Sequence, residues 1–484
     1  MASRKAVLDV STAIRFTRFP PQGPATPAPT SELVVVADTS PSEPEARIIS
    51  SPQVGRLHPI VGLLLISLAL PVYFNLGPLR LSPNRALLLL LFFPAMVGWL
   101  SGAAGRIRAA DFWVVGLCLW GTIAMFISAG VSTIQFSGIM TVETLGAYLI
   151  GRVYIRTEAQ YRAVIRILGM VVLLLVPGAI IESFTGIRIY NRLFDSVFPT
   201  FPWADYEKRL HMFRAQTGFE HPILFGVFTA FCFAPIYTNA RATAERLKAW
   251  MRSSPILVAT FFSLSMGAYL GIMIQLMLMA WGLVLRNVRR RWKILGILTT
   301  ISYVVVDLLS NRTPFQVFSS YVAFDAHTAY WRVLIFKYGM ENVWDNPFFG
   351  LGYYDNSWKR PDFMATSSID NLWLVFAVRY GIPGFILIFG VYLAVLIGLM
   401  RAKLINPILR SHRDALVFSF IGLGIAICTV HLWSSSFVFM MFMLGSGAWL
   451  SDDSSDGNVS ANANDVTDGI MRRELGRTRL NVKR

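Results

Sequence analysis

Long apolar blocks alternate with short polar connections along most of this 484-residue chain. Most blocks run for about 17 to 25 residues, the length that lets a helix cross the hydrocarbon core of a bilayer. We therefore predict an all-α fold, a polytopic transmembrane helix bundle of about 12 spans. The predicted spans are 57–76, 86–101, 112–129, 132–150, 163–183, 221–238, 255–265, 267–285, 294–309, 381–400, 415–430 and 434–450. The seventh is short, and with the eighth it forms either a tight pair or one broken helix.

Both ends of the chain have a different composition. Residues 1–56 are rich in Pro, Ser, Thr and Ala, which is typical of disorder, and they lack the charged start and apolar stretch of a signal peptide. Residues 451–484 are rich in Asp, Ser and Asn and then basic. We predict two disordered tails, 1–56 and 451–484, around a transmembrane domain at 57–450.

The charges define the two sides of the predicted bundle. Charged residues make up only 15% of the chain against 54% hydrophobic ones, whereas a soluble domain has about 25% charged residues. The net charge of +16 resides mostly in alternate connections, which by the positive-inside rule face the cytoplasm together with both tails. We therefore expect membrane lipids, and no nucleic acid, as partners of these cations. The basic connections hold Arg106/Arg108, Arg152/Arg156/Arg162/Arg166, Arg241/Arg246/Lys248/Arg252, Arg286/Arg289/Arg290/Arg291/Lys293 and Arg401/Lys403/Arg410/Arg413.

Two long connections then fall on the outer face, residues 184–220 and 310–369. Long loops in a compact protein usually carry function. The stretch 369–400 is too long for one span, yet the charges on its two sides require an odd number of crossings. We therefore predict an interfacial or re-entrant helix at 370–380 and a true span from residue 381.

The first outer loop ends in a polar cluster directly before a span. Arg214, Glu220 and His221 precede Pro222, which suits the first turn of a helix. Polar groups at such a helix start favour anions, and the planar fork of arginine suits phosphate. The alternative for Glu220 and His221 is helix capping combined with contacts to lipid headgroups.

The second outer loop contains a predicted amphipathic helix at about 326–343. His327, Tyr330 and Arg332 lie at helical spacing, and Lys337 follows on the same helix. The alternative is a helix lying on the bilayer with its aromatic residues at headgroup depth. The loop ends at Asp370.

The remaining reactive residue types give little chemistry. Cys118, Cys232 and Cys428 each lie inside an apolar block without metal-binding spacing, so we expect small buried side chains and no metal site. Glu143 is a carboxylate at mid-membrane depth, and such groups are often functional. It keeps a proton-coupled transporter as an alternative, although we find no matching acid and no inverted repeat.

Several segments together resemble the O-antigen ligase and Wzy-type polysaccharide polymerase superfamily over about 57–450. They are RAQTGFEHPILFG before a span, SLSMGAYLGI at a span start, AHTAYWRVLIFKYGMENVWDNPFFGLGYYDN in the large loop, and SSIDNLWLVFAVRYGIPG after it. The resemblance implies metal-independent, inverting glycosyl transfer from polyprenyl-pyrophosphate-linked glycans on the periplasmic face of a bacterial inner membrane. It implies no cofactor. Arg214 and Arg332 match the family's essential arginines.

Two departures from the family pattern refine this expectation. Where the family often has SRG at a span start, this chain has Ser265-Met266-Gly267, so one arginine is missing. The HN motif of the ligases is Asp370-Asn371 here. Loss of that histidine favours a polymerase, most similar to exopolysaccharide polymerases of the rhizobial type, over a ligase that transfers glycan to a lipid acceptor.

The resemblance gives each candidate residue a role. Arg214, Arg332 and Arg379 would stabilise the pyrophosphate leaving group, and Glu220, His221 or Asp370 would take the proton of the acceptor hydroxyl. His327, Tyr330, Lys337, Arg379 and Asn371 would bind substrate, and Trp203, Tyr353, Tyr354 and Trp358 would stack on sugar rings. Expected partners are the carrier-linked oligosaccharide, membrane lipids, and flippase and chain-length or export proteins of the same pathway. A flippase or exporter, and a structural or regulatory membrane protein, remain as other readings.

Overall fold

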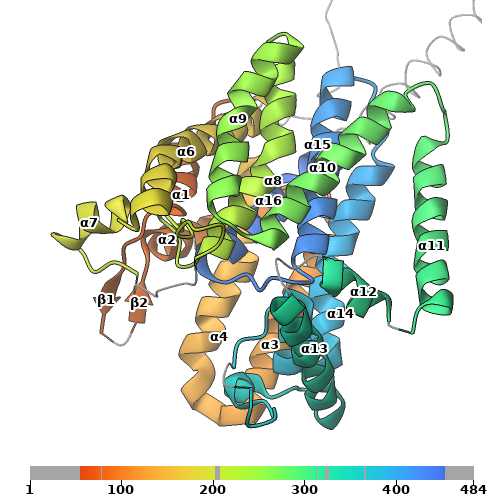
Figure 1. Ribbon diagram of the computed structural model, residues 1–484. Coiled ribbons are helices and arrows are strands. Elements are labelled where there is room, and N and C mark those ends of the chain that lie inside the picture. The colour runs from red at the N-terminus through yellow and green to blue at the C-terminus, as the bar shows by residue number, and fades with distance from the viewer. Residues whose placement is uncertain are drawn as a thin grey trace, which may run out of the picture. The chain divides into compact units, whose positions relative to one another are not determined.

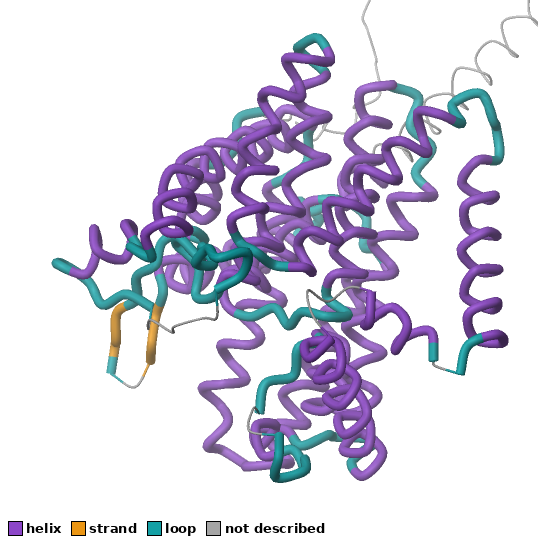
Figure 2. Tube along the Cα trace, in the orientation of Figure 1, coloured by secondary structure: helices purple, strands orange, loops and turns teal. Residues whose placement is uncertain are grey.

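A computed structural model describes residues 55–77, 79–201, 208–311, 313–321, 326–364 and 367–452. Nearly all regular structure in these residues is helical, apart from one short β-hairpin (Figures 1 and 2). The predicted all-α membrane fold is therefore confirmed. The predicted tails lie outside the described residues, except for 55–56 at one end and 451–452 at the other.

The elements follow one another in this order. They are α1 (Pro59–Ser67), β1 (Phe74–Leu76), β2 (Leu79–Leu81), α2 (Pro83–Leu100), α3 (Ala109–Ala129), η1 (Gly130–Thr133), α4 (Ile134–Thr141), η2 (Val142–Gly146), α5 (Ala147–Tyr154), α6 (Glu158–Thr185), α7 (Ile189–Asp195), α8 (Pro222–Arg241), α9 (Arg246–Phe262), α10 (Met266–Val284), α11 (Arg291–Leu309), α12 (Pro314–Tyr321), α13 (Ala326–Asp345), η3 (Gly352–Ser357), α14 (Leu372–Arg401), α15 (Pro407–Ala426) and α16 (Ser434–Ser446). The strands β1 and β2 pair in antiparallel fashion, with Phe74 opposite Leu81.

Eight helical segments of the described chain are long and apolar enough to cross a membrane. One of them, a continuous run over residues 109–154, contains two predicted spans: the chain turns at Gly130 (φ +62°), and α3 packs against α4. The helix at the first predicted span is shorter than expected, since α1 has only nine residues. The helix that contains most of the seventh predicted span, α9, has 17 residues. The chain is a multi-pass membrane protein, and the number of about 12 spans stays a prediction.

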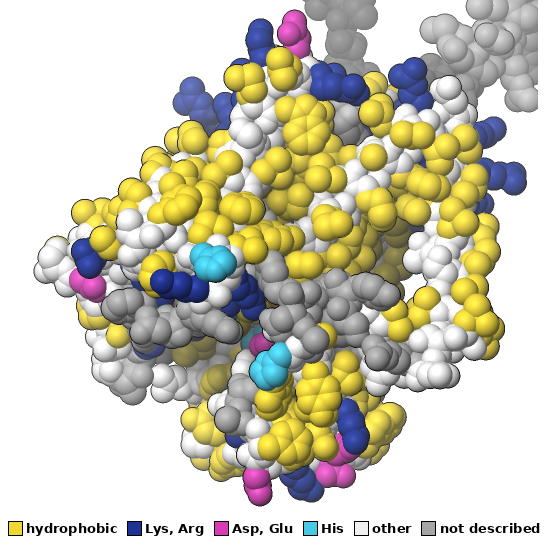
Figure 3. All heavy atoms as spheres, in the orientation of Figure 1, with side chains coloured by type: hydrophobic (Ala, Val, Ile, Leu, Met, Phe, Trp, Pro, Cys, Tyr) yellow, Lys and Arg dark blue, Asp and Glu magenta, His cyan; other side chains and the backbone are white. Residues whose placement is uncertain are grey.

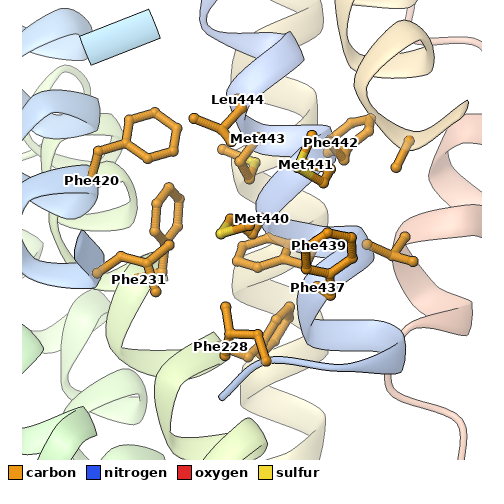
Figure 4. Packing of buried hydrophobic residues seen from close by; sticks show 14 of the residues in the cluster. Phe228, Phe231, Phe420, Phe437, Phe439, Met440, Met441, Phe442, Met443 and Leu444 are labelled. Atoms are coloured by element: carbon orange, nitrogen blue, oxygen red, sulfur yellow. The ribbon is translucent and has the colours of Figure 1, made fainter. Parts of the chain in front are cut away.

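The core is centred on α16 and α8, the two most enclosed of the crossing helices. In their most apolar 18-residue stretches, 83% and 78% of the residues are buried. Residues 437–444 of α16 are buried on every side of the helix, as expected for an apolar helix in the middle of a bundle. Figure 4 shows Phe439 of α16 against Phe228 and Phe231 of α8, with Phe420 of α15 beyond. By contrast, α11 buries none of its described side chains.

Small residues bring pairs of helices close together. A Cβ on Gly445 of α16 would lie 2.0 Å from the carbonyl oxygen of Tyr148, and one on Gly151 of α5 would lie 2.2 Å from that of Phe442. Close backbone approach at small residues is how membrane helices gain packing without a hydrophobic driving force between them. These contacts fix α5, and the polar residues at its end, against α16.

A buried network of charges joins α3, α5 and the end of α16. The guanidinium of Arg152 is fully buried, with Nε 3.5 Å from Asp111 and Nη1 3.2 Å from Asp452. Arg108 and Arg156 also pair with Asp452. Asp452 is helical and buried, and three arginines pair with this carboxylate; the boundary of the C-terminal tail at residue 451 stays a prediction.

Replacing Asp452 with asparagine is expected to lower the stability of the folded protein by about 3 kcal/mol, because it leaves the buried charge of Arg152 partly uncompensated. The midpoint of unfolding in detergent, followed by tryptophan fluorescence, measures the effect. Asp345→Asn is the matched control, since the pair between Asp345 and Lys359 is exposed and should contribute less than about 1 kcal/mol. Equal midpoints for the two variants would contradict the assigned role of Asp452.

The second outer loop folds as a unit on the first part of α14. A separate apolar cluster there joins α13, residues 358–369 and α14; its members include Leu334, Val343, Trp358, Met364 and Val378. The predicted amphipathic helix at 326–343 is confirmed as α13. Trp358 is 1% exposed and donates its indole N–H to the carbonyl of Ser367 at 2.9 Å, so the expectation that it stacks on sugars is wrong.

The long helix α14 is interrupted at Gly381, the residue at which the sequence predicts a span to begin. Gly381 has φ +72° and ψ −177°, a combination that only glycine adopts readily. The break lets the turn after α13 reach the helix: the amide of Ile382 donates to the carbonyl of Pro347 at 2.7 Å. The second loop thereby packs against residues 372–380 of α14.

The substitution Gly381→Ala is expected to cost at least about 2 kcal/mol of stability, from the backbone conformation and from a Cβ placed 2.1 Å from the carbonyl oxygen of Phe348. Gly296→Ala in α11 is the control, because its Cβ would meet no atom within 4 Å and alanine favours a helix. A thermal shift assay of both variants distinguishes them. A Gly381→Ala protein as stable as the control would show that the break is not required.

Candidate functional site

The segment before α8 is held in place by backbone hydrogen bonds to two other helices. The amide of Phe213 donates to Ser183 at the end of α6, and that of Ala215 donates to Phe262 at the end of α9, both at 2.9 Å. The carboxylate of Glu182 accepts from the amides of Gln216 (3.2 Å) and Thr217 (2.9 Å). The backbone of Arg214 is therefore fixed, and the residue is only 9% exposed.

Two further arginines from the same loop add positive charge here. Arg188 pairs with Glu182 at 3.3 Å, and Arg209 donates to the carbonyl of Leu264 at 2.8 Å, directly before α10. Arg209 thus reaches the start of α10, two residues before Met266. The sequence analysis assigned no role to Arg209, and no local signal distinguished it from the other loop cations.

The histidine at this helix start is neutral. Burial first, and then the charges of Arg214, Arg209 and Arg188, lower the pKa of His221 to about 3. Its Nδ1 accepts a hydrogen bond from the amide of Ile223 at 3.0 Å and caps α8. The ring proton of the neutral form must therefore reside on Nε2, so the geometry favours His221 as a hydrogen-bond donor and disfavours it as the general base.

Acid is expected to destabilise the protein through His221. The pKa is about 3 in the folded state and near 6.5 in an unfolded chain, so the contribution is complete above pH 6.5 and is lost as the pH falls toward 3. His221→Asn keeps a capping side chain without the titration. Its unfolding midpoint should fall less steeply than that of the wild type between pH 6.5 and pH 4. Parallel pH dependences would contradict this source of acid lability.

Glu220 connects the first loop to the start of α16. One carboxylate oxygen accepts from Trp433 Nε1 at 2.7 Å and the other from Ser434 Oγ at 2.9 Å. The rings of His221 and Trp433 meet edge to face, with centroids 5.7 Å apart. Trp433 and Ser434 were not among the predicted site residues. Their only signal in the sequence is the presence of a tryptophan and a histidine in the short connection between two spans.

A buried ion pair lies near this carboxylate. Glu143, in the π-helical turn η2, accepts from Arg85 of α2 at 2.6 Å, and its charge also interacts with that of Glu220. The mid-membrane carboxylate of the sequence analysis therefore has a partner. A π turn inside a helix often marks a functional site, and this one brings Glu143 toward the first loop.

The second group of predicted residues surrounds a cavity of only about 10 Å³, room for about one water molecule. Arg332, Asp370 and Asn371 line it together with Cys428. Asn371 caps α14 by accepting from the amide of Leu374 at 3.1 Å, so its side chain has a structural role. Asp370 accepts from the hydroxyl of Ser368 through Oδ1. This is the one hydrogen bond to that carboxylate within the described residues, so Oδ2 retains acceptor capacity there.

The connection between α15 and α16, residues 427–433, is common to both groups. Cys428 lines the pocket of Arg332, while Trp433 holds Glu220. The amide of Leu372 donates to Ile427 at 3.0 Å, which ties the end of the second loop to this connection. Trp433 follows Cys428 by five positions, a reach of at most about 18 Å. The structure thus gathers the ends of both outer loops around one short segment.

The other predicted binding residues are engaged with other side chains or exposed. Arg379 forms an ion pair with Asp355, with Nε 2.7 Å from the carboxylate, which clamps η3 to α14. His327 accepts from Trp331 Nε1 at 2.7 Å, so its Nε2 is occupied. Tyr330 is 60% exposed, and Lys337 lies over the ring of Tyr338.

The remaining expectations concern aromatic residues and metals. Tyr353 and Tyr354 are about half exposed, as sugar stacking requires, whereas Trp203 lies outside the described residues. No group of three or more His, Cys, Asp or Glu side chains suited to a metal ion occurs in the part of the chain that the structure describes.

Comparison with known proteins identifies one related family. Residues 253–389, from α9 to the middle of α14, match the family model of O-antigen ligases. The match confirms the resemblance to the O-antigen ligase and Wzy superfamily; similarity to the rhizobial type remains an expectation. The matched range contains Arg332, Asp370 and Asn371, while Arg214 and Glu220 precede it. No curated protein matches the chain.

Proposed function

We propose, from the O-antigen ligase domain at residues 253–389, that this membrane enzyme is a polysaccharide polymerase acting on polyprenyl-pyrophosphate-linked oligosaccharides. The observation that carries the proposal is the pocket shared by Arg332 and Asp370, next to the connection that holds Glu220. Displacement of a pyrophosphate by a hydroxyl requires a cation beside the leaving group and a base beside the attacking hydroxyl, on the opposite face of the anomeric carbon. The enzyme would reside in a bacterial inner membrane with both termini in the cytoplasm.

In the proposed reaction the acceptor hydroxyl oxygen attacks the anomeric carbon of the donor glycan. The bond from that carbon to the pyrophosphate oxygen breaks, and the polyprenyl pyrophosphate leaves with the electron pair. Arg332, Arg214 and Arg209 supply positive charge where negative charge develops on the leaving group. Asp370 takes the hydroxyl proton through its available oxygen. Attack from the opposite face inverts the anomeric configuration.

Glu220 and His221 have positioning roles in this scheme. Both oxygens of Glu220 are engaged by Trp433 and Ser434, which leaves Asp370 the better base. His221 presents an N–H to its surroundings and fixes the start of α8. The three arginines also supply the charge that a metal ion provides in other glycosyl-transferring enzymes, which is why we propose metal-independent transfer.

The proposal is tested with the purified full-length protein in proteoliposomes and a carrier-linked oligosaccharide repeat as substrate. A ladder of products that differ by one repeat, formed equally well with EDTA, is the expected result. Formation of free polyprenyl pyrophosphate without any ladder would exclude a polymerase. Loss of the ladder in EDTA, restored by a divalent cation, would exclude the metal-independent reaction.

The description of the matched family favours one alternative, a ligase that transfers finished glycan to a lipid acceptor. The two activities differ in what a deletion strain accumulates. A polymerase mutant should retain single carrier-linked repeats on the outer face of the membrane. A ligase mutant should retain long carrier-linked or free polymer and lack the lipid-attached form. Accumulation of single repeats on the inner face would indicate a flippase.

A further inference from the structure

A cavity remote from this site lies between the starts of α1 and α6 and the adjoining ends of α8 and α9. It measures about 740 Å³, and arginines from three parts of the chain line it: Arg56, Arg162, Arg166 and Arg252. None of its described lining residues is acidic. Figure 3 shows Lys and Arg side chains gathered toward the end of the bundle that carries the α8–α9 connection, beside a broad hydrophobic band.

The charges of this cavity are mostly uncompensated by the protein. Arg162 contacts Glu158 at 3.3 Å and Asn239 at 3.2 Å. Arg252 donates to the hydroxyl of Thr243 at 3.3 Å, and Arg166 to a backbone carbonyl. Among the described residues, Glu158 is thus the one carboxylate paired with any of the four arginines, which leaves a net positive charge at the rim.

The floor and walls of the cavity are apolar. Leu57, Ile165 and Ile236 line it below the arginines, and Gly169 leaves room where a side chain would otherwise project. One turn further along α6, Met170, Leu173 and Leu174 are 55–69% exposed and continue the apolar strip along the helix. A row of cations above an exposed apolar strip matches a molecule with an anionic head and hydrocarbon tails.

We propose that this cavity binds one anionic phospholipid, with its phosphate among Arg56, Arg166 and Arg252 and its acyl chains along α6. Basic pockets between membrane helices on the cytoplasmic side suit such headgroups, and the arginine fork suits phosphate oxygens. The positive-inside rule assigns the cavity to the cytoplasmic leaflet, opposite the proposed catalytic pocket. The site is independent of the proposed polymerase activity.

The test uses delipidated full-length protein in detergent, titrated with phosphatidylglycerol or phosphatidylcholine of the same chains and followed by native mass spectrometry. The wild type should retain one phosphatidylglycerol at concentrations at which phosphatidylcholine is lost. Replacing Arg56, Arg166 and Arg252 together by glutamine should weaken retention by roughly a hundredfold. The matched control replaces Arg286, Arg289 and Arg290, exposed cations that line none of the cavities described here; it should change retention by less than about twofold.

A second variant addresses the acyl chains without altering charge. Gly169→Leu fills the floor of the cavity, where a Cβ would be 3.7 Å from Ile236, and should also weaken retention of phosphatidylglycerol. Retention unchanged in both the arginine and the glycine variants, or lost equally in the control, would overturn the proposal. Inorganic phosphate or glycerol phosphate that displaces the lipid at equal concentration would identify a free-anion site and exclude the lipid.

Discussion

Replacing Arg332 with alanine is expected to reduce polymer formation by about 10²- to 10³-fold, the usual loss when one group that stabilises developing negative charge is removed. Arg332 lines the pocket that also contains Asp370. The apolar cluster of the second loop packs α13, and with it Arg332, against α14. Arg214→Ala should act similarly in the proposed mechanism, because this buried arginine, whose neighbouring backbone is bonded to α6 and α9, supplies positive charge to His221 and the start of α8.

The measurement is the rate of ladder formation in proteoliposomes, supported by polysaccharide chain length in a complemented deletion strain. Arg332→Lys keeps the charge and loses the two-pronged geometry, so it should retain an intermediate rate. Lys359→Ala serves as the control, since this exposed lysine of the same loop forms only a surface ion pair with Asp345. Normal polymer from Arg332→Ala at normal protein level would remove this arginine from the mechanism.

Local patterns predicted the helices of this protein well. Apolar blocks of membrane-spanning length became helices, the amphipathic pattern at 326–343 became α13, and Gly381 interrupts α14 where charge counting required a boundary. These features follow from residues close together in the sequence, which is why one sequence reveals them. The short α1 shows the limit: apolar composition continues beyond residue 67, but the chain turns there into a hairpin.

Contacts between distant residues could not be predicted in the same way. Glu220 and Trp433 are 213 positions apart, and neither carries a local mark of the other. Arg152 and Asp452 are 300 positions apart, and composition placed the aspartate in a disordered tail. Arg379 resembled a substrate ligand because it is a cation at an outer helix, yet its partner is Asp355 of η3. A charge predicts that a partner exists, and only the fold identifies it.

Replacing Asp370 with asparagine is expected to lower the rate of polymerisation by about 10²- to 10⁴-fold, the contribution of a positioned general base. Asparagine preserves the shape of the side chain and can still accept the hydrogen bond from Ser368, so folding and donor binding should persist. The loss should therefore appear in kcat, with KM for the carrier-linked donor nearly unchanged.

Glu220→Gln distinguishes this role from that of the second carboxylate. Glutamine can keep both contacts, by accepting from Trp433 Nε1 and donating to Ser434 Oγ, but as neutral hydrogen bonds that are weaker than those of the carboxylate, so the start of α16 loosens. We expect a smaller loss of rate than for Asp370→Asn, accompanied by a lower unfolding midpoint. If Glu220→Gln abolishes polymerisation while Asp370→Asn leaves the rate nearly unchanged, the base is Glu220.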